Sequence, residues 1–276
     1  MMGWLRKLSG SRTEGSGGAA HIPDALWART LAQYPFLNQS GVPGADALRR
    51  MTHAFLDTKQ FHGAGGLLIT DAMAVAIAAQ ACLPVLQLRT PLRGIDWYDD
   101  FVGIVVHPGA VVARRETIDA AGVVHHYEEV LSGEAMQDGP ITLSWQDVEE
   151  SGASARDGYN VVIHEFVHKI DMRNGTPDGC PPLPAGFMGA SGASAARKAW
   201  RSAMEQHYLA FCDQLSLADR FGAEPPWLDA YGATALDEFF AVTSEAYFVN
   251  RQRFAEGFPG LLPMFDAFFR PGPPAG

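Results

Sequence analysis

Cysteine is scarce in this chain of 276 residues, which has only Cys82, Cys180 and Cys212. An odd and sparse set excludes a disulfide framework and is typical of a reducing compartment. Long apolar runs are missing as well: the longest, residues 72–88, is interrupted by Gln and Pro and is too short to cross a bilayer. No apolar segment of a secretory signal follows the basic N-terminus. These absences predict a soluble, cytoplasmic protein without membrane association.

Positive charge is also in short supply. Lys and Arg number 21 against 31 Asp and Glu, which gives a formal net charge of -10. So acidic a chain is poorly suited to bind nucleic acid phosphates or an anionic membrane, and we expect no direct nucleic acid binding. No glycine-rich phosphate loop joins a predicted strand to a predicted helix, which argues against nucleotide chemistry. The expected partner is a neutral or basic peptide or protein.

Hydrophobic residues make up 47% of the chain, as in a protein with a folded core. We predict a flexible tail at 1–20, one domain at 21–270 and a Pro-rich tail at 271–276. Apolar spacing and turn residues predict a mostly helical α+β fold with a small mixed sheet. The predicted helices are 22–56 with a turn at 41–44, 72–84, 158–173, 195–221 and 235–249; the predicted strands are 102–106, 122–130 and 141–145; and 59–66 is a predicted loop.

The segment 159–171 contains the pattern His-Glu-x-x-His within an apolar helix. His164 and His168 are four residues apart, so both lie on one helix face and can offer a ring nitrogen to the same metal ion. Glu165 follows the first histidine and can take a proton from a water on that ion. Polar residues so close together in an apolar helix need partners when they are buried. A catalytic metal site beside the small sheet explains them better than two unrelated core histidines.

A catalytic zinc normally has three protein ligands, and the third must come from elsewhere in the chain. The metzincin extension needs Gly and His three and six residues after the second His, where this chain has Asp171 and Asn174. The segment 231–245 instead supplies two glutamates, Glu238 and Glu245. Thr234 and Asp237 form a near capping box that would start a helix just before Glu238. Spacing alone leaves both glutamates open as the third ligand.

Four segments together resemble a known family. They are HEFVHKIDMRNG, YGATALDEFFAVTSEAYF, GLLITDAMAVAIAAQACLPVL and LSGEAMQDGPITLSWQDV, and the likeness extends from about residue 50 to 265. This set is similar to the Mlc titration factor A family of zinc peptidases. The His-Glu-x-x-His pattern alone would not be specific to that family.

The resemblance implies a zincin-like fold of the gluzincin type, similar to the catalytic domain of anthrax lethal factor. It implies one Zn2+ per chain, held by His164, His168 and Glu238, with Glu165 as the general base. The family's tyrosine seven residues before the ligand glutamate falls on Tyr231, whose phenol would donate to the oxyanion. Glu245 would then not bind the metal but would orient one of its ligands through a hydrogen bond. The implied activity is that of an aminopeptidase-like metallopeptidase.

The same resemblance implies a second kind of partner, a transcriptional repressor of the Mlc type, whose binding relieves glucose repression. The alternative to an enzyme is therefore a non-catalytic, zinc-containing protein that sequesters such a repressor. Glu165 favours the enzyme, because a degenerate site would be expected to lose the base first. The base contributes nothing to metal affinity.

Two further hypotheses concern the surroundings of the motif. Residues 141–145 alternate like an edge strand, and such a strand could pair with an extended substrate. Asp171 follows His168 by three residues on the same helix. It could orient a ligand imidazole, or it could bond to nearby loop amides.

Overall fold

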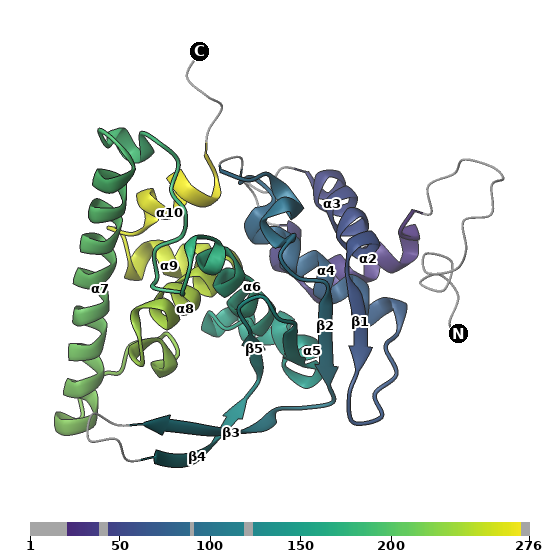
Figure 1. The fold of residues 1–276 in the computed structure, drawn as a ribbon, viewed down its shortest axis with the longest axis horizontal. Coiled ribbons are helices and arrows are strands. Elements are labelled where there is room, and N and C mark those ends of the chain that lie inside the picture. Colours follow the sequence, from purple (N-terminus) through teal and green to yellow (C-terminus); the bar gives the residue numbers. More distant parts are fainter. Residues whose placement is uncertain (1–20, 39–43, 89–90, 119–123, 272–276) are drawn as a thin grey trace.

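In the computed structural model, which describes residues 21–38, 44–88, 91–118 and 124–271, a small sheet lies among helices from both halves of the chain (Figure 1). This arrangement confirms the predicted α+β fold, mostly helical and with a mixed sheet. The predicted tails, 1–20 and the end of 271–276, lie outside the described residues, as does most of the predicted 41–44 turn.

The main sheet has four strands in the order β1-β2-β6-β5. Strands β1, β2 and β6 are parallel, and β5 is antiparallel to β6. The bounds are β1 Gln60–Gly63, β2 Gly103–His107, β5 Gly133–Ala135 and β6 Ile141–Ser144; a separate antiparallel hairpin pairs β3 Val111–Ile118 with β4 Val124–Leu131. The prediction of an edge strand at 141–145 was wrong, because β6 lies between two strands and β5 forms the edge. Likewise, β1 falls where a loop was predicted.

The N-terminal helices cover one side of the sheet (Figure 1). They are α2 Asp24–Gln33, α3 Ala45–Thr58 and α4 Asp71–Val85. Thr70 caps α4 by accepting a hydrogen bond from the backbone N–H of Met73. Pro84 lies in the last turn, and the helix ends one residue later. Residues from Met73 to Val85 are all buried, so α4 is a core helix on every face.

The C-terminal helices form the other side of the molecule. They are α5 Trp145–Ser154, α6 Val161–Asp171, α7 Ala193–Phe221, α8 Leu236–Val249, α9 Arg251–Gly257 and α10 Leu262–Phe269. Short 3-10 turns are η1 Pro35–Asn38, η2 Gly94–Tyr98, η3 Ala155–Asp157, η4 Met172–Asn174, η5 Phe187–Gly189 and η6 Ala230–Ala233. Aromatic rings join these helices: Trp200 of α7 stacks on Phe265 of α10 with centroids 5.9 Å apart. Such a pair adds to the energy of area burial and fixes α7 against α10.

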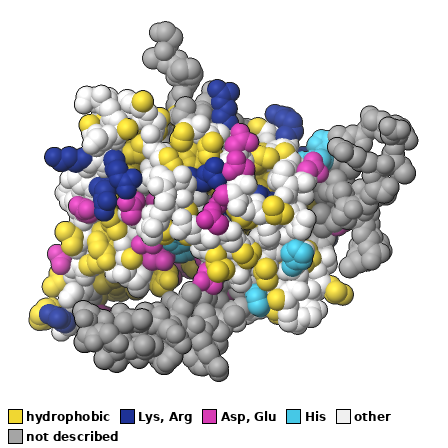
Figure 2. All heavy atoms as spheres, viewed as in Figure 1, with side chains coloured by type: hydrophobic (Ala, Val, Ile, Leu, Met, Phe, Trp, Pro, Cys, Tyr) yellow, Lys and Arg dark blue, Asp and Glu magenta, His cyan; other side chains and the backbone are white. Residues whose placement is uncertain are grey.

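Helix α6 lies near the centre of the molecule, between the sheet and α8 (Figure 1). None of the helices in the described ranges is long and apolar enough to cross a membrane. On the face in Figure 2, Lys and Arg side chains occur in several places with Asp and Glu side chains beside them. The described side chains on that face therefore form no continuous basic surface, in line with the acidic composition.

Candidate metal centre and active site

Local capping fixes the start of α6, the helix that carries the motif. The Asn160 side-chain oxygen accepts a hydrogen bond of 2.8 Å from the backbone N–H of Ile163, which closes the first turn. The Asn160 amide donates to the side chain of Gln80 on α4 at 2.7 Å. This link between two buried polar groups ties the motif helix to the core helix and sets where its histidines point.

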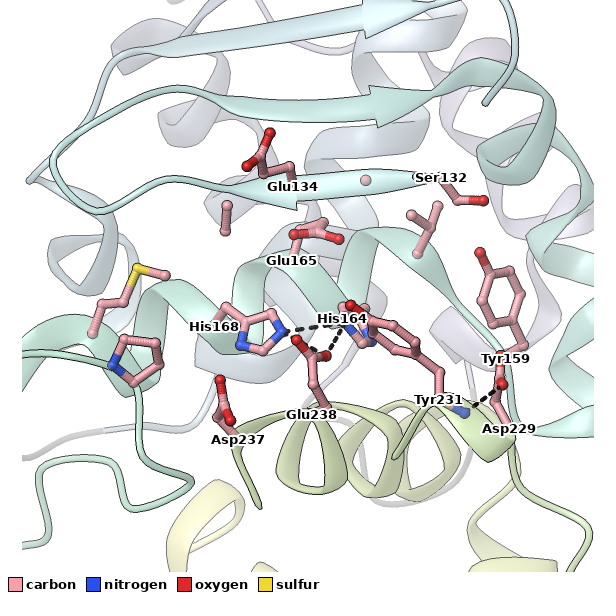
Figure 3. Close-up of a pocket in the computed structure, with 15 residues that line it drawn as sticks. Ser132, Glu134, Tyr159, His164, Glu165, His168, Asp229, Tyr231, Asp237 and Glu238 are labelled. Atoms are coloured by element: carbon pink, nitrogen blue, oxygen red, sulfur yellow. Dashed lines mark hydrogen bonds and ion pairs between the residues drawn. The ribbon is translucent and has the colours of Figure 1, made fainter. Parts of the chain in front are cut away.

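Three ligand atoms converge from α6 and α8 (Figure 3). The Nε2 atoms of His164 and His168 are 3.2 Å apart, and Oε2 of Glu238 lies 3.0 Å and 3.2 Å from them. Ligand atoms about 2.05 Å from a tetrahedral zinc would be about 3.3 Å from one another. The spacing and the chemistry of this set, two imidazoles and one carboxylate, therefore fit a small divalent ion.

Helix α8 presents Glu238 from its first turn. The helix begins at Leu236 after the N-cap Ala235, and no side chain caps it. The predicted capping box was wrong: the Thr234 hydroxyl donates instead to the carbonyl of Tyr231, at 2.7 Å. The free amide N–H groups of an uncapped first turn favour a carboxylate there, which suits the position of Glu238.

Glu245 lies two turns further along α8, next to Nδ1 of His164, the ring nitrogen that faces away from the three converging atoms. Its Oε1 is 2.7 Å from Nδ1 of His164, and its Oε2 accepts a hydrogen bond from the backbone N–H of Asn160. The residue is 1% exposed. The two glutamates that spacing could not separate thus take different places, Glu238 among the three converging atoms and Glu245 behind His164. A carboxylate there fixes the tautomer that leaves Nε2 free to ligate.

Charge and burial set the protonation of this cluster. Burial alone would lower the pKa of His164, but the carboxylates of Glu245 and Glu238 outweigh it and raise that pKa well above its usual value. Burial would raise the pKa of Glu238, yet hydrogen bonds from His164 and His168 hold it well below its ordinary range. Burial raises the pKa of Glu245. Without an ion the cluster holds protons between its ring nitrogens and carboxylates, and a metal would replace them.

Glu165 lies above these ligands, against the edge strand β5 (Figure 3). It is 5% exposed, and burial raises its pKa to about 7 against the pull of the two histidines. A Cβ atom at Gly133 would lie 2.4 Å from Oε1 of Glu165. Only glycine at that position leaves room for the carboxylate, so β5 and the Glu165 side chain are fitted to each other.

Tyr231 reaches the same cavity from η6. Its ring centroid is 6.0 Å from that of His164, and the residue is 39% exposed. Asp229 accepts a hydrogen bond of 2.9 Å from the backbone N–H of Tyr231, which fixes the turn. The phenol is therefore held beside the ligands while remaining open to a molecule that enters.

The cavity that contains these groups has a volume of about 480 Å³. Sequence reasoning missed much of its wall, because most of the other polar residues come from short or irregular segments: Ser132, Glu134, Tyr159 and Asp229, with Asp237 from the first turn of α8. A signal for Ser132 and Glu134 was present in the Ser-Gly-Glu-Ala run, but three residues are too few for strand periodicity. The cavity therefore combines the α6 motif, the η6–α8 segment and one edge of the sheet.

Strand β5 offers that cavity a free backbone edge. Ser144 N–H donates to the Ser132 carbonyl at 2.7 Å, and Met136 N–H to the Pro140 carbonyl at 3.4 Å. Hydrogen-bonded residues alternate along an antiparallel pair, so Ser132, Glu134 and Met136 turn their backbone groups toward β6. Gly133 and Ala135 turn theirs away from β6, where an extended chain could pair with them.

Asp171 bonds to the loop that follows α6. Its Oδ2 accepts hydrogen bonds from the backbone N–H groups of Asp178 and Gly179, at 2.9 Å and 2.7 Å. Of the two hypotheses for this residue, the loop-binding one describes its contacts. Asp171 therefore anchors the loop that follows α6.

Comparison with known proteins agrees with this geometry. The family described as glucose-regulated metallo-peptidase M90 matches residues 9–270. A protein from Klebsiella pneumoniae named Mlc titration factor A is 32% identical over 263 residues, which cover 95% of this chain and 91% of that protein. Its namesake from Serratia proteamaculans is 34% identical over 253 residues, or 89% of each chain. The similarity thus spans nearly the whole molecule.

Proposed function

The chain belongs to the glucose-regulated metallo-peptidase M90 family, the Mlc titration factor A family, and on that premise we propose that it is a zinc-dependent, aminopeptidase-like peptidase of the gluzincin type. The observation that carries the proposal is the convergence of His164, His168 and Glu238 next to the buried carboxylate of Glu165. Two imidazoles and one carboxylate are a ligand set of catalytic zinc sites, which keep a fourth position open.

His164, His168 and Glu238 would hold one zinc ion per chain. The ion would lower the pKa of a coordinated water and polarise the scissile carbonyl. Glu165 accepts the proton that the attacking water loses and returns it to the leaving amine. Its carboxylate is buried in the wall of the same cavity, next to the three converging ligand atoms. The Tyr231 phenol donates a hydrogen bond to the carbonyl oxygen as negative charge develops there.

The peptide substrate would lie along β5 as an added strand. Gly133 and Ala135 have backbone groups directed away from β6, and an antiparallel peptide residue opposite either one makes two hydrogen bonds with it. Main-chain pairing of this kind binds peptides of varied sequence. It also brings the peptide backbone close to Glu165, because Gly133 packs against that carboxylate.

A second candidate function is the binding of a transcriptional repressor of the Mlc type. The observation that favours it is the name of the relatives, Mlc titration factor A, together with similarity over most of the chain. Repressor binding and peptidase activity can occupy different surfaces of one protein. If activity is absent, the alternative is a non-catalytic, zinc-containing protein that sequesters the repressor. A cytoplasmic location would suit either role and agrees with three free cysteines among the described residues.

The test is hydrolysis of a chromogenic aminoacyl and peptidyl panel by zinc-loaded wild type and by Glu165→Gln. We expect the variant to keep its zinc and to lose about 10²- to 10⁴-fold in kcat, because only the proton acceptor is removed. Metal content is measured by elemental analysis and the fold by circular dichroism. Equal turnover by both proteins would remove Glu165 as the base. If both bind zinc and neither is active, the sequestering role becomes the better proposal, which a pull-down of the repressor with Glu165→Gln then tests.

A further inference from the structure

We propose that Ala135, Met172 and Pro177 form an apolar subsite for the substrate side chain that precedes the scissile bond, so that this enzyme cleaves after apolar residues. The inference rests on the peptidase function proposed above and adds the class of residue that the site would select. All three residues line the cavity that also contains the two histidines and Glu165. Each of them is partly exposed, so a molecule that enters the cavity can contact them.

Met172 continues the row of side chains that begins with the two histidines. Its backbone is helical, and its N–H donates to the carbonyl of His168, the bond of an unbroken helical turn. Residues four apart lie on one helix face, so His164, His168 and Met172 follow one another toward the C-terminal end of α6. Met172 therefore lies next to His168, on the side away from His164, and its side chain lines the cavity there.

The loop after α6 holds Pro177 at the same end of the cavity. Oδ2 of Asp171 accepts hydrogen bonds from the backbone N–H groups of Asp178 and Gly179, at 2.9 Å and 2.7 Å. Because Asp171 directly precedes Met172, these two bonds bring the loop back to the end of α6. Pro177 directly precedes Asp178, and its ring restricts the backbone further. The loop thus presents a fixed apolar ring to the cavity.

Strand β5 supplies the third apolar wall. A Cβ atom at Gly133 would meet the Glu165 carboxylate. Side chains two residues apart on a strand point to the same face, so the methyl group of Ala135 also lies on the side of β5 that faces α6. Glu134, between them, lies on the other side of the strand (Figure 3). The three apolar residues thus come from three segments that meet where β5 and α6 both end.

The opposite end of the cavity has a different character. Tyr159, Asp229 and Tyr231 lie there, and they carry hydroxyl or carboxylate groups (Figure 3). Val161, an apolar residue three positions before the first histidine, is only 2% exposed and offers a ligand little surface. Apolar surface that a substrate side chain can cover is therefore concentrated at the end marked by the second histidine.

Strand polarity decides which substrate side chain reaches this subsite. Strand β5 runs from Ser132 toward Glu134, and Glu134 lies at the His168 end (Figure 3). In the more stable antiparallel pairing, a peptide added to β5 has its N-terminal part at the His168 end. The residue that contributes the scissile carbonyl precedes the bond, so its side chain lies toward the subsite. For an aminopeptidase, this residue is the N-terminal one.

The test compares binding of L-leucine hydroxamate and L-asparagine hydroxamate to the zinc-loaded protein by titration calorimetry. The two side chains have nearly the same shape, but only that of leucine is apolar, and the readout does not require turnover. We expect wild type to bind the leucine compound at least about 10-fold more tightly, as for burial of a leucine side chain. Acetohydroxamate, which has no such side chain, reports on the metal centre alone.

Met172→Gln keeps the length of the side chain but makes its end polar. The preference should fall to about 3-fold or less, with zinc content and acetohydroxamate affinity unchanged. Pro177→Ser should lower the preference as well, and Met172→Leu should keep it. Met188→Gln is the matched control, because Met188 is 60% exposed and is not one of the residues that line the cavity. Val161→Thr makes the corresponding change at the opposite end and should also keep the preference.

Equal affinity for the leucine and asparagine compounds in wild type would overturn the proposal. Loss of the preference in Val161→Thr, with its retention in Met172→Gln, would overturn it too, because the side chain would then lie at the other end. Asp237 also lies at the His168 end (Figure 3). Tighter binding of L-lysine hydroxamate than of L-leucine hydroxamate would therefore assign this end to a basic side chain instead.

Hydrolysis of leucine p-nitroanilide and asparagine p-nitroanilide separates this inference from the proposed function. If the hydroxamate preference is intact and neither anilide is hydrolysed, the peptidase alone is contradicted. If both anilides are hydrolysed with equal kcat/KM, the apolar subsite alone is contradicted. Faster hydrolysis of the leucine anilide, reduced in Met172→Gln and retained in Met188→Gln, is the result that both proposals expect.

Discussion

Helices α4 and α6 pack against each other in the core, but they bury different kinds of side chain. From Met73 to Val85, α4 buries only apolar residues apart from Gln80. Helix α6 buries Glu165, His168, Lys169 and Asp171 among its apolar residues. Helix α4 can stabilise the fold through burial of apolar surface alone. Each buried ionisable group of α6 needs a hydrogen-bond or ion-pair partner that offsets its desolvation.

The partners in α6 divide into two groups. Lys169 donates to the carbonyls of Met136 and Gly139 at 2.6 Å and 2.9 Å, and Asp171 accepts two loop amides, so these residues fasten adjoining segments. Glu165 and His168 face the cavity. The buried polar residues of α6 therefore have two roles. Lys169 and Asp171 attach neighbouring segments, and Glu165 and His168 line the cavity.

Ile77→Ala is expected to give the largest effect on stability, because it removes buried apolar side-chain atoms from α4. Ile77 is fully buried, and truncation leaves a cavity that lowers the free energy of unfolding by about 2–5 kcal/mol. Urea denaturation of the metal-free protein measures this loss. Leu217→Ala on α7, at a residue 51% exposed, is the control and should change stability by less than about 0.5 kcal/mol. Equal losses in both variants would contradict the role given to α4.

Gly133→Ala tests the fit between β5 and α6. The added methyl would lie 2.4 Å from the Glu165 carboxylate and must displace it, so kcat of the zinc-loaded protein should fall by about 10²-fold with zinc retained. Gly103→Ala on β2 is the matched control, since its Cβ would meet Pro140 at an ordinary 3.4 Å. Unchanged kcat in Gly133→Ala would show that the carboxylate does not need this space.

Glu245→Gln tests whether a buried partner of α6 acts on the metal. The amide can keep one of the two hydrogen bonds to His164 and Asn160 but loses the charge, so zinc affinity should fall about 10- to 100-fold. Competition with a chromogenic chelator measures the affinity. Glu256→Gln, at an exposed position on α9, should leave it unchanged. An unaltered affinity in Glu245→Gln would reduce Glu245 to a structural role.

The same contrast explains how much of the fold the sequence could predict. Helices α6, α7 and α8 have apolar spacing or flanking helix signals, α4 is an almost continuous apolar run, and the predicted bounds of all four differ from the observed ones by a few residues. Strands β1 and β5 have four and three residues, too few for a period of two to be visible. Helices α9 and α10 are short, and no prediction covered them.

At the site, spacing within one helix brought His164, Glu165 and His168 together without any tertiary information. The third candidate ligand could not be derived in that way, because Glu238 and Glu245 are two turns apart on nearly the same face of α8. Only the packing of α8 on α6 separates them. Glu134 joins the cavity through the pairing of β5 with β6, a contact that no local pattern contains.

Asp171→Asn is expected to have the smallest effect, a change in the pH dependence of stability. Burial raises the pKa of Asp171 to about 6, against the opposing effect of the Gly179 amide, while an unfolded Asp titrates near 3.9. Between these values the folded state holds a proton that the unfolded state has released, so stability from this group is highest below pH 4 and falls as the pH rises toward 6. The Asn variant lacks this titration. Relative to wild type it should therefore gain on the order of 1 kcal/mol between pH 4 and 7, measured by urea denaturation of the metal-free protein. Asp157→Asn, at the surface, is the control and should show no such gain. Parallel pH profiles of stability for wild type and Asp171→Asn would contradict the prediction. They would mean that Asp171 is ionised throughout this range and held by its two amide donors.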